Sequence, residues 1–471
     1  MRKGIPFVTI IIVAGVGFAA GLAGSLLGGY ECELLGRKVC LMSKNAMVFA
    51  ALLLMGLAPS VTYLMIGRTV HGYCGGALMG AVPVYVSEIC QPQIRGTMAG
   101  TLGAFYCLGT TSVFTMGAAL NWRHLLLACS AFPLTNFIML LFATESPTWY
   151  LLRNRSEDAL KTLKTLRGDP QVAQSEHDSL VENFVKRQEC AVQTKDVPKW
   201  KRIWDMAREP TFLLPMASVM LIKVFGAHLA GMAPLFLYLN KMLIEIKVPG
   251  DPYWIGAGLM IFRSITSLFG PFLIKLFRKK VLFTICASLI VTGNIILGVS
   301  IQYDLPRLLN VQDNLVVFKW LPVAGICLMY IGLGFGQFNI VMSWQGELLP
   351  SYGRAVGGGL LGVIDGLVLF SVGKFLPSVS HAIGLGHIFL ICACLCFCLI
   401  LFVWFMVPET KGLSLEDVEE YYRVRCYGNK VEPAPPQNFD RLSLYDNVSI
   451  WGEELNADKK QERQSHQHYT S

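Results

Sequence analysis

The sequence predicts an all-α membrane protein built from two related helical bundles, and three observations support this fold class. Of the 471 residues, 53% are hydrophobic and only 15% are charged, whereas soluble domains contain about 25% charged residues. The apolar residues fall into stretches of about 20, the length that crosses roughly 30 Å of hydrocarbon. Two of these stretches lead into the same acid-then-arginine pattern, which indicates that one half of the chain repeats the other.

Eleven apolar stretches are long enough to span a bilayer as helices. Their Gly and Pro residues are of the kind that membrane helices tolerate. The stretches cover residues 7–29, 39–58, 61–83, 97–117, 124–143, 211–240, 253–275, 281–301, 318–342, 354–378 and 384–407. The predicted domains are an N-terminal bundle, a cytoplasmic helical loop, a C-terminal bundle and a tail that is largely disordered after about residue 425, with the boundaries 1–143, 144–210, 211–407 and 408–471.

The repeat also predicts that one helix is missing from the first half. Glu88 precedes Arg95 by seven residues, and Glu347 precedes Arg354 by the same spacing, 259 positions later. Glu88 follows three apolar stretches, whereas Glu347 lies at the end of the fourth stretch of its half. We therefore expect that the first half lacks its opening helix. Either the sequence comes from a truncated gene model or isoform, or the protein has only eleven helices.

The net charge of +8 is explained by membrane topology rather than by an acidic partner. The basic residues lie mainly in the loops, and alternating spans place those loops and the tail on one side, which the positive-inside rule identifies as the cytoplasm. No nucleic-acid partner is expected, and the sequence carries no signal for an oligomeric state. The 14 cysteines lie mostly in apolar stretches, so no disulfide framework is inferred. Cys392, Cys394, Cys396 and Cys398 alternate, and a period of two does not place side chains on one face of a helix.

Five short motifs resemble a known family. The run from Gly29 to Lys38 resembles the G-x-x-x-D-R-x-G-R-R/K loop of the major facilitator superfamily, with Glu33 in place of the family Asp. Four further motifs look like signatures of its sugar porter family, and their order relative to the apolar stretches strengthens the resemblance. These are Gly67-Arg68, Pro83 to Gly96, Glu145-Ser146-Pro147 and Pro408 to Gly412. The run from Glu145 to Gly168 looks most like insect facilitated trehalose transporter-like proteins.

The resemblance implies a major facilitator fold of two pseudo-symmetric bundles with twelve helices, of which eleven are visible. It also implies facilitated transport of a sugar, trehalose or a hexose, by alternating access, in a multi-pass protein of the plasma membrane. Charged residues at the cytoplasmic helix ends would pair between the bundles and form a reversible lock; the alternative is interfacial charge that only orients the helices. The predicted gate residues are Glu33, Gly36, Arg37, Lys38, Glu88, Arg95, Glu145, Lys280, Glu347, Arg354 and Glu409.

The resemblance is weakest at the substrate site. Sugar porters typically show Q-Q-x-S-G in the helix that opens the second half, where this chain has Ile222 to Gly226. The candidate substrate-binding residues are polar or aromatic and lie in the second half: Lys223, His228, Asp365, Gln337, Asn339 and Trp344. An unpaired charge in a span costs about 2.5–3.5 kcal/mol, so we expect Asp365 to pair with Lys223 or Arg263, either around a solute or as a structural ion pair.

Other functions remain open at this point. Lys223 and Asp365 could serve a carrier of a polar or ionic solute, and loss of the amide lining would also permit a transporter-like protein that acts as a sensor or scaffold. A channel is disfavoured because the sequence shows no pore-loop pattern or ring of acids. It also shows no phosphate loop, metal-ligand spacing or nucleophile constellation, so neither an enzyme nor a cofactor is expected.

Overall fold

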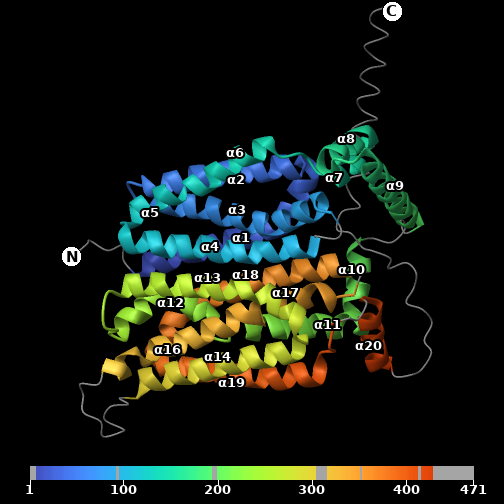
Figure 1. Cartoon of the computed structure of the whole chain (residues 1–471). Helices are drawn as coiled ribbons and strands as arrows, with labels where there is room; N and C mark the ends of the chain where they lie inside the picture. The colour runs from blue at the N-terminus through green and yellow to red at the C-terminus, as the bar shows by residue number, and fades with distance from the viewer. Residues whose placement is uncertain are drawn as a thin grey trace, which may run out of the picture.

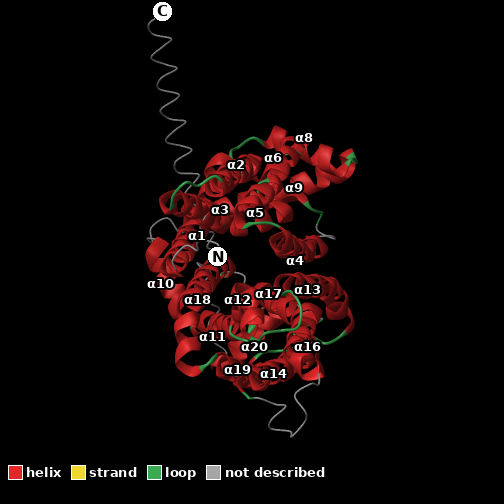
Figure 2. Cartoon of the chain, turned by 90° about the vertical axis from the view of Figure 1, so that its left-hand side faces the viewer, coloured by secondary structure: helices red, strands yellow, loops and turns green. Residues whose placement is uncertain are grey.

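The structure is a computed structural model that describes residues 7–91, 95–193, 199–303, 316–350, 353–411 and 415–427. Within these ranges all the regular structure is helical, and no strand forms (Figure 2). All eleven predicted spans are largely helical, although turns interrupt 124–143 and 211–240. Eight helices in the described ranges are long and apolar enough to cross a membrane by length and composition. That the first half lacks an opening helix stays a prediction.

The spans form two halves that lie side by side in both ribbon views (Figures 1 and 2). The first half contains α1 (Phe7–Leu35), α2 (Arg37–Gly56), α3 (Val61–Ile89), α4 (Arg95–Ala119), α5 (Trp122–Cys129) and α6 (Ala131–Phe142). The second half contains α11 (Pro210–Leu221), η1 (Ile222–His228), α12 (Met232–Glu245), α13 (Pro252–Leu276), α14 (Lys279–Gln302), α16 (Val316–Gly332), η2 (Leu333–Gln337), α17 (Phe338–Glu347), α18 (Arg354–Ile383) and α19 (Leu385–Met406). The halves meet where α1 packs on α18 and α4 packs on α13.

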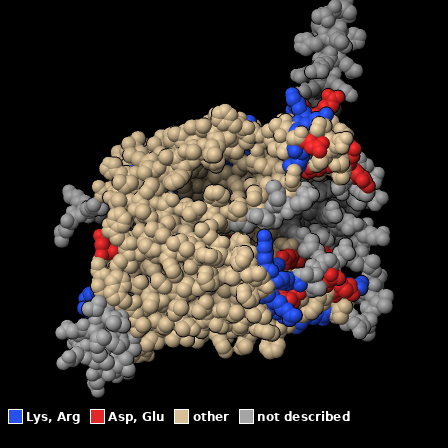
Figure 3. All heavy atoms as spheres, in the orientation of Figure 1, with Lys and Arg blue, Asp and Glu red and all other residues tan. Residues whose placement is uncertain are grey.

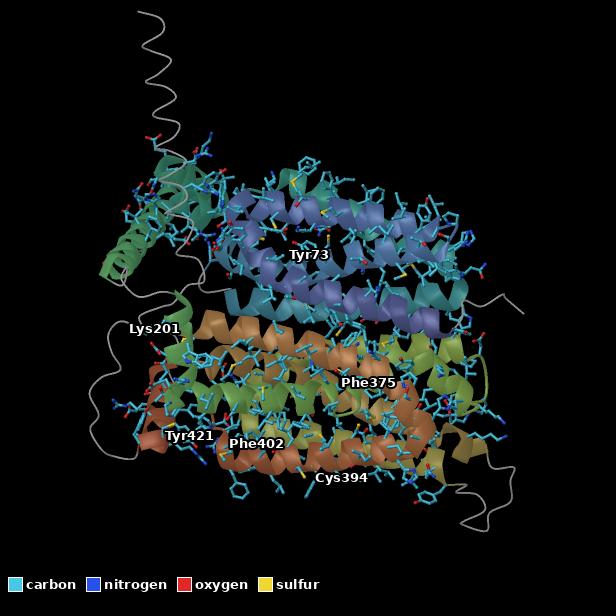
Figure 4. The ribbon with its side chains drawn as sticks, turned by 180° about the vertical axis from the view of Figure 1, so that it is seen from behind. Tyr73, Lys201, Phe375, Cys394, Phe402 and Tyr421 are labelled. Atoms are coloured by element: carbon cyan, nitrogen blue, oxygen red, sulfur yellow. The ribbon has the colours of Figure 1, made fainter. Side chains whose placement is uncertain are left out.

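Charged residues gather at one end of the molecule. On the face shown in Figure 3, Lys, Arg, Asp and Glu cluster near the short helices, whereas the broad flank along the spans is almost free of charge. These helices are α7 (Pro147–Leu152), α8 (Ser156–Arg167), α9 (Pro170–Gln193), α10 (Lys199–Arg208) and α20 (Leu415–Tyr427). Figure 4 places Lys201 of α10 and Tyr421 of α20 at this same end. The positive-inside rule predicts that this end faces the cytoplasm, so it is called the cytoplasmic end below.

The helices α7, α8 and α9 pack against the first half, whereas α10 and α20 pack against α11 of the second half. Ala159 and Leu163 on α8 are buried, as their helical spacing requires. The Arg167 side chain bonds Glu176 through Nε (2.6 Å) and donates from Nη1 to the Ile89 carbonyl at the end of α3 (2.9 Å). The hydrogen bond with Glu176 raises the pKa of Arg167. The Ser156 hydroxyl at the start of α8 bonds His177 Nε2 of α9 at 2.8 Å, which joins these two helices.

The four alternating cysteines of α19 do not share a face, as the helical period predicts. Cys392 and Cys396 are buried, whereas Cys394 and Cys398 are exposed. Figure 4 shows Cys394 on the outer edge of the second half. The alternation therefore does not bring the four thiols together.

Glycines allow α1 and α3 to pack backbone against backbone. A Cβ added at Gly76 would lie 2.0 Å from the Gly21 carbonyl oxygen, and one at Gly72 would lie 2.1 Å from that of Gly17. Small residues at such crossings let membrane helices approach closely, and the association is then driven by van der Waals packing.

Gly76→Ala should therefore destabilise the protein, whereas Gly75→Ala should not. A methyl group at Gly76 forces α1 and α3 apart, and overpacking of this kind costs about 1–3 kcal/mol. A Cβ at Gly75 meets no described atom within 4 Å, so this matched change should stay within about 0.5 kcal/mol. Thermal unfolding of the two variants in detergent measures the difference. Equal shifts in melting temperature would contradict the close contact.

Candidate functional site

At the cytoplasmic end of the first half, Arg37 joins α2 to α3. Its guanidinium donates from Nε to Glu88 Oε2 (3.0 Å) and from Nη2 to Glu88 Oε1 (3.1 Å). The Ser146 hydroxyl donates to the same carboxylate. The arginine side chain is 7% exposed. Two parallel bonds between a guanidinium and a carboxylate fix the orientation of both groups, so this pair holds two helix ends in register.

Glu145 caps the start of α2 from a distant part of the chain. Its Oε1 accepts hydrogen bonds from the backbone N–H groups of Arg37 (2.9 Å), Lys38 (3.1 Å) and Ser146 (2.9 Å). The first N–H groups of a helix have no partner within the helix, and the helix dipole favours a negative charge there. Gly36, with φ of +96°, turns the chain into this position; a Cβ on it would lie 2.5 Å from Glu145 Oε2.

The second half repeats both arrangements. Glu409 accepts from the backbone N–H groups of Lys279 (3.1 Å) and Lys280 (3.2 Å) at the start of α14. The Lys279 ammonium pairs with Glu347 at the end of α17 and donates to the Ser343 hydroxyl at 2.9 Å. Arg37, Glu88 and Glu145 thus correspond to Lys279, Glu347 and Glu409. The pseudo-symmetry inferred from motif spacing is therefore present in the contacts themselves.

Two expectations about the gate need correction. Lys280 does not form the second-half ion pair, because its Nζ donates to the Trp404 carbonyl (3.4 Å) while Lys279 reaches Glu347. Aligning the triplets at 36–38 and 278–280 residue by residue would have matched Arg37 with Lys279. The described ion pairs among the gate residues also lie within each half, not between the halves, because their partners sit on neighbouring helices of one bundle.

The remaining gate residues have less defined roles. The Lys38 Nζ donates to the Leu141 carbonyl at 3.0 Å. Glu33 is buried, and its backbone carbonyl accepts from Trp149 Nε1 at 2.9 Å. The side chains of Arg95 and Arg354 lie outside the described part of the structure, although both residues begin helices. Ion pairs between either of these arginines and an acid of the gate therefore stay a prediction.

A polar cluster in the first half was not predicted from the sequence. Lys44 Nζ pairs with Glu31 Oε2 at 2.5 Å, and the Tyr73 hydroxyl donates to Glu31 Oε1 at 2.6 Å. The ammonium also lies 4.9 Å from the centre of the Tyr73 ring, and Figure 4 shows Tyr73 inside the first half. The available signal was Lys44 itself, an ionisable residue in an apolar stretch. This cluster joins α1, α2 and α3.

The candidate substrate cluster is centred on Asp365 of α18. Its Oδ2 pairs with Lys223 Nζ at 2.6 Å, and its Oδ1 lies 3.1 Å from His228 Nε2. Lys223 also donates to Gln345 Oε1 at 2.7 Å. Of the two partners expected for Asp365, the structure thus selects Lys223. The cluster lies close to the seam between the halves, because a Cβ on neighbouring Gly366 would lie 2.5 Å from the Leu22 side chain of α1.

Lys223 and His228 are positioned by the π-helical segment η1. A π turn leaves part of the backbone without its usual hydrogen bonds, and such turns are frequent at functional sites. Gln337 of η2 donates from Nε2 to the Gly226 carbonyl at 2.7 Å, which satisfies one of these groups in a setting without water. Just beyond η1, Gly231 adopts φ of +96°, and Asn294 donates to the Ala230 carbonyl at 2.9 Å. The span 211–240 is therefore a broken helix.

The structure divides the candidate residues of the 333–347 segment into two sets. Gln337 and Trp344 are completely buried; Trp344 packs on the Phe283 ring with centroids 5.2 Å apart. Both were predicted to bind the solute. This prediction is wrong for their side chains, because both face the core of the second half. Asn339 and Gln345 lie on another side of the helix: Asn339 Oδ1 would be 3.7 Å from a Cβ at Gly103 of the first half, and Gln345 contacts Lys223.

Arg263 occupies the middle of α13 and is only 5% exposed. Its guanidinium carbon lies 5.8 Å from the centre of the Phe236 ring, a cation–π geometry that contributes about 0.5–2 kcal/mol. No hydrogen bond or ion pair among the described residues involves the guanidinium, and Nη1 is buried without a partner. A charge at mid-span costs about 2.5–3.5 kcal/mol on insertion scales, so the ring contact does not fully offset the burial of this charge.

Comparisons with known proteins place this geometry in context. A family model described as "Sugar (and other) transporter" matches residues 6–422. The facilitated glucose transporter member 6 of solute carrier family 2 from Homo sapiens is 31% identical over 424 residues, covering 86% of this chain and 80% of that protein. The facilitated trehalose transporter Tret1 from Polypedilum vanderplanki is 28% identical over 407 residues, covering 86% of this chain and 78% of its own length.

A solved structure shares the fold. The inward open conformation of the xylose transporter XylE from E. coli superposes with a TM-score of 0.69 at 16% sequence identity. The match covers 88% of this chain and 89% of the bacterial chain. The arrangement of the two halves is thus that of a known membrane-transporter fold.

Proposed function

Since the chain belongs to the sugar transporter family, we propose that it carries a sugar across a membrane by facilitated, alternating-access transport. It is a multi-pass membrane protein, and we place it in the plasma membrane. The relatives named for facilitated transport of glucose and of trehalose support a hexose or trehalose as the solute. The proposal divides the chain at the boundaries expected from sequence, 1–143, 144–210, 211–407 and 408–471.

The observation that carries the proposal is the polar cluster at the seam between two pseudo-symmetric halves. Carriers of this kind bind solute near the bilayer midplane, where two repeats meet and where helices are broken. Lys223 and His228 lie on the π-helical part of a broken helix, and Asp365 faces them from α18. We propose that these three residues, with Asn339 and Gln345, contact the solute, because hydroxyl groups of a sugar bond to both donors and acceptors.

Uptake into proteoliposomes tests the proposal. The purified chain should give saturable uptake of radiolabelled D-glucose or trehalose, with L-glucose as the stereochemical control and protein-free liposomes as the blank. Facilitated movement predicts an initial rate that does not depend on a proton gradient. A monodisperse, thermally stable preparation without saturable uptake of either sugar would instead favour the sensor or scaffold function.

A further inference from the structure

Arg263 lies on α13, the helix of the second half that packs against α4 of the first half. Arg263 is eleven residues from the first residue of α13 and thirteen from the last, which places it deep in the span. The next residue, Ser264, lies 2.6 Å through its hydroxyl from Thr111 Oγ1 of α4 and donates to the Cys107 carbonyl at 3.1 Å. Arg263 is therefore the sequence neighbour of a residue that joins the two halves.

Aromatic side chains lie close to the Arg263 guanidinium. The Phe236 ring covers the cation, and Tyr106 of α4 stacks on Phe236 with centroids 6.5 Å apart and planes at 20°. The hydroxyl of Tyr330 is buried and has no hydrogen-bond partner among the described residues. Both tyrosine hydroxyls lie within electrostatic range of Arg263. Among the described residues no acid pairs with this guanidinium, and both Arg263 Nη1 and the Tyr330 hydroxyl are buried without a hydrogen-bond partner.

Two acids on the described spans, Asp365 and Glu31, already have basic partners. Asp365 is held by Lys223 and His228, and Glu31 is held by Lys44. The Lys223–Asp365 pair is neutral as a unit and does not require an ionic solute. Arg263 is different, because a buried charge in a span generally faces a partner or a water-filled path. The charge that remains to be balanced at this seam is therefore positive.

We infer that Arg263 binds an oxyanion on the transported solute, and that the solute class includes sugars bearing a carboxylate, such as hexuronates. The inference rests on the proposed carrier function and extends it from neutral to anionic sugars. A guanidinium presents N–H donors in a fork that matches a carboxylate or a phosphate, and Nη1 is a donor left without a partner. The Tyr330 and Tyr106 hydroxyls would add donors to the bound anion, and the ring of Phe236 would cover the sugar.

Ligand-dependent thermal stability of the purified chain tests the inference without requiring transport. D-Glucuronate should raise the melting temperature of the wild-type protein in a saturable manner, and Arg263→Asn should weaken its apparent affinity at least tenfold. D-Glucose should stabilise the wild-type and Arg263→Asn proteins with affinities within threefold of each other. Glucose 6-phosphate, acetate and chloride form three further arms. A preference for glucose 6-phosphate would identify phosphate as the source of the oxyanion, whereas equal stabilisation by acetate or chloride would overturn a sugar-anion site.

Uptake measurements separate this inference from the function on which it rests. The wild-type carrier should take up D-glucuronate, and an inside-positive membrane potential should accelerate that uptake without changing D-glucose uptake, because only the first solute carries charge. Arg263→Lys retains the charge without the planar fork and should fall between wild type and Arg263→Asn. A carrier that transports D-glucose but neither binds nor transports the anions would overturn the inference and leave the proposed function intact. If the anions stabilise the protein but no sugar is taken up, the anion site would be supported and the proposed transport function would be overturned.

Discussion

Replacement of Asp365 by Asn is expected to reduce sugar uptake at least tenfold and to destabilise the protein. The substitution removes the counter-ion of Lys223, whose side chain is 5% exposed. Removing one member of a buried ion pair costs about 3–5 kcal/mol, because the remaining charge is left uncompensated in a poorly solvated site. The protein should therefore show both a lower melting temperature in detergent and a lower initial rate of uptake into proteoliposomes.

Two further variants distinguish the loss of the Lys223–Asp365 ion pair from the loss of the solute site. The double variant Lys223→Gln with Asp365→Asn removes both charges together, so it should regain most of the lost thermal stability while uptake stays low. Lys374→Gln changes one charge on the same helix, but Lys374 is exposed and should have an effect below about 1 kcal/mol. Failure of the double variant to recover stability would contradict the ion pair as the cause, and full uptake by Asp365→Asn would exclude Asp365 from the solute site.

The second large effect is expected at Glu145. Glu145→Ala removes the acceptor of three backbone N–H groups, those of Arg37, Lys38 and Ser146. Hydrogen bonds to charged groups contribute about 1.5–3 kcal/mol each, and water at the cytoplasmic surface will replace some of them, so the net loss should be about 3 kcal/mol. Thermal or denaturant unfolding in detergent measures this loss.

The repeat supplies the controls for Glu145. Glu409→Ala should act in the same direction, because Glu409 accepts from the corresponding two N–H groups of α14. Glu145→Gln keeps an acceptor oxygen without the charge and should lie between Ala and wild type. Glu157→Gln changes an exposed acid on α8 and should shift stability by only about 0.5 kcal/mol. A loss at Glu145 no larger than that at Glu157 would show that the cap contributes little.

The spans and the pseudo-symmetry could be predicted from sequence because both are repetitive signals. Apolar length determines which segments cross the bilayer, and the doubled acid-arginine motif marks corresponding helix ends. The contacts at those ends were harder to assign. Lys279 and Lys280 are adjacent in the sequence, and only the start of α14 decides that the side chain of Lys279 faces Glu347. Whether an ion pair lies within a half or between halves depends on tertiary packing.

The solute-facing side of 333–347 could not be predicted from helical periodicity. The π turn η2 adds a residue to the helix, which rotates everything downstream by about 100° relative to a regular α-helix. Gln337 and Trp344 are seven residues apart and share a face, and the structure shows that this face is buried, while neighbouring Gln345 reaches Lys223. The partner of Asp365 was narrowed to two candidates by the rule that mid-span charges pair. That Arg263 has no ion-pair partner among the described residues could not be predicted from the sequence, because it depends on the position of every neighbouring group.

The placement of both helix caps inside their own halves has a consequence for the energetics of the transport cycle. Contacts such as Arg37–Glu88 and Lys279–Glu347 persist when one half rocks against the other, so their energies cancel in the difference between inward- and outward-facing states. Substitutions there should change the amount of folded carrier and leave the ratio of the two states unaltered. Substitutions at the α4–α13 seam, where Thr111 meets Ser264, should instead change that ratio at constant abundance.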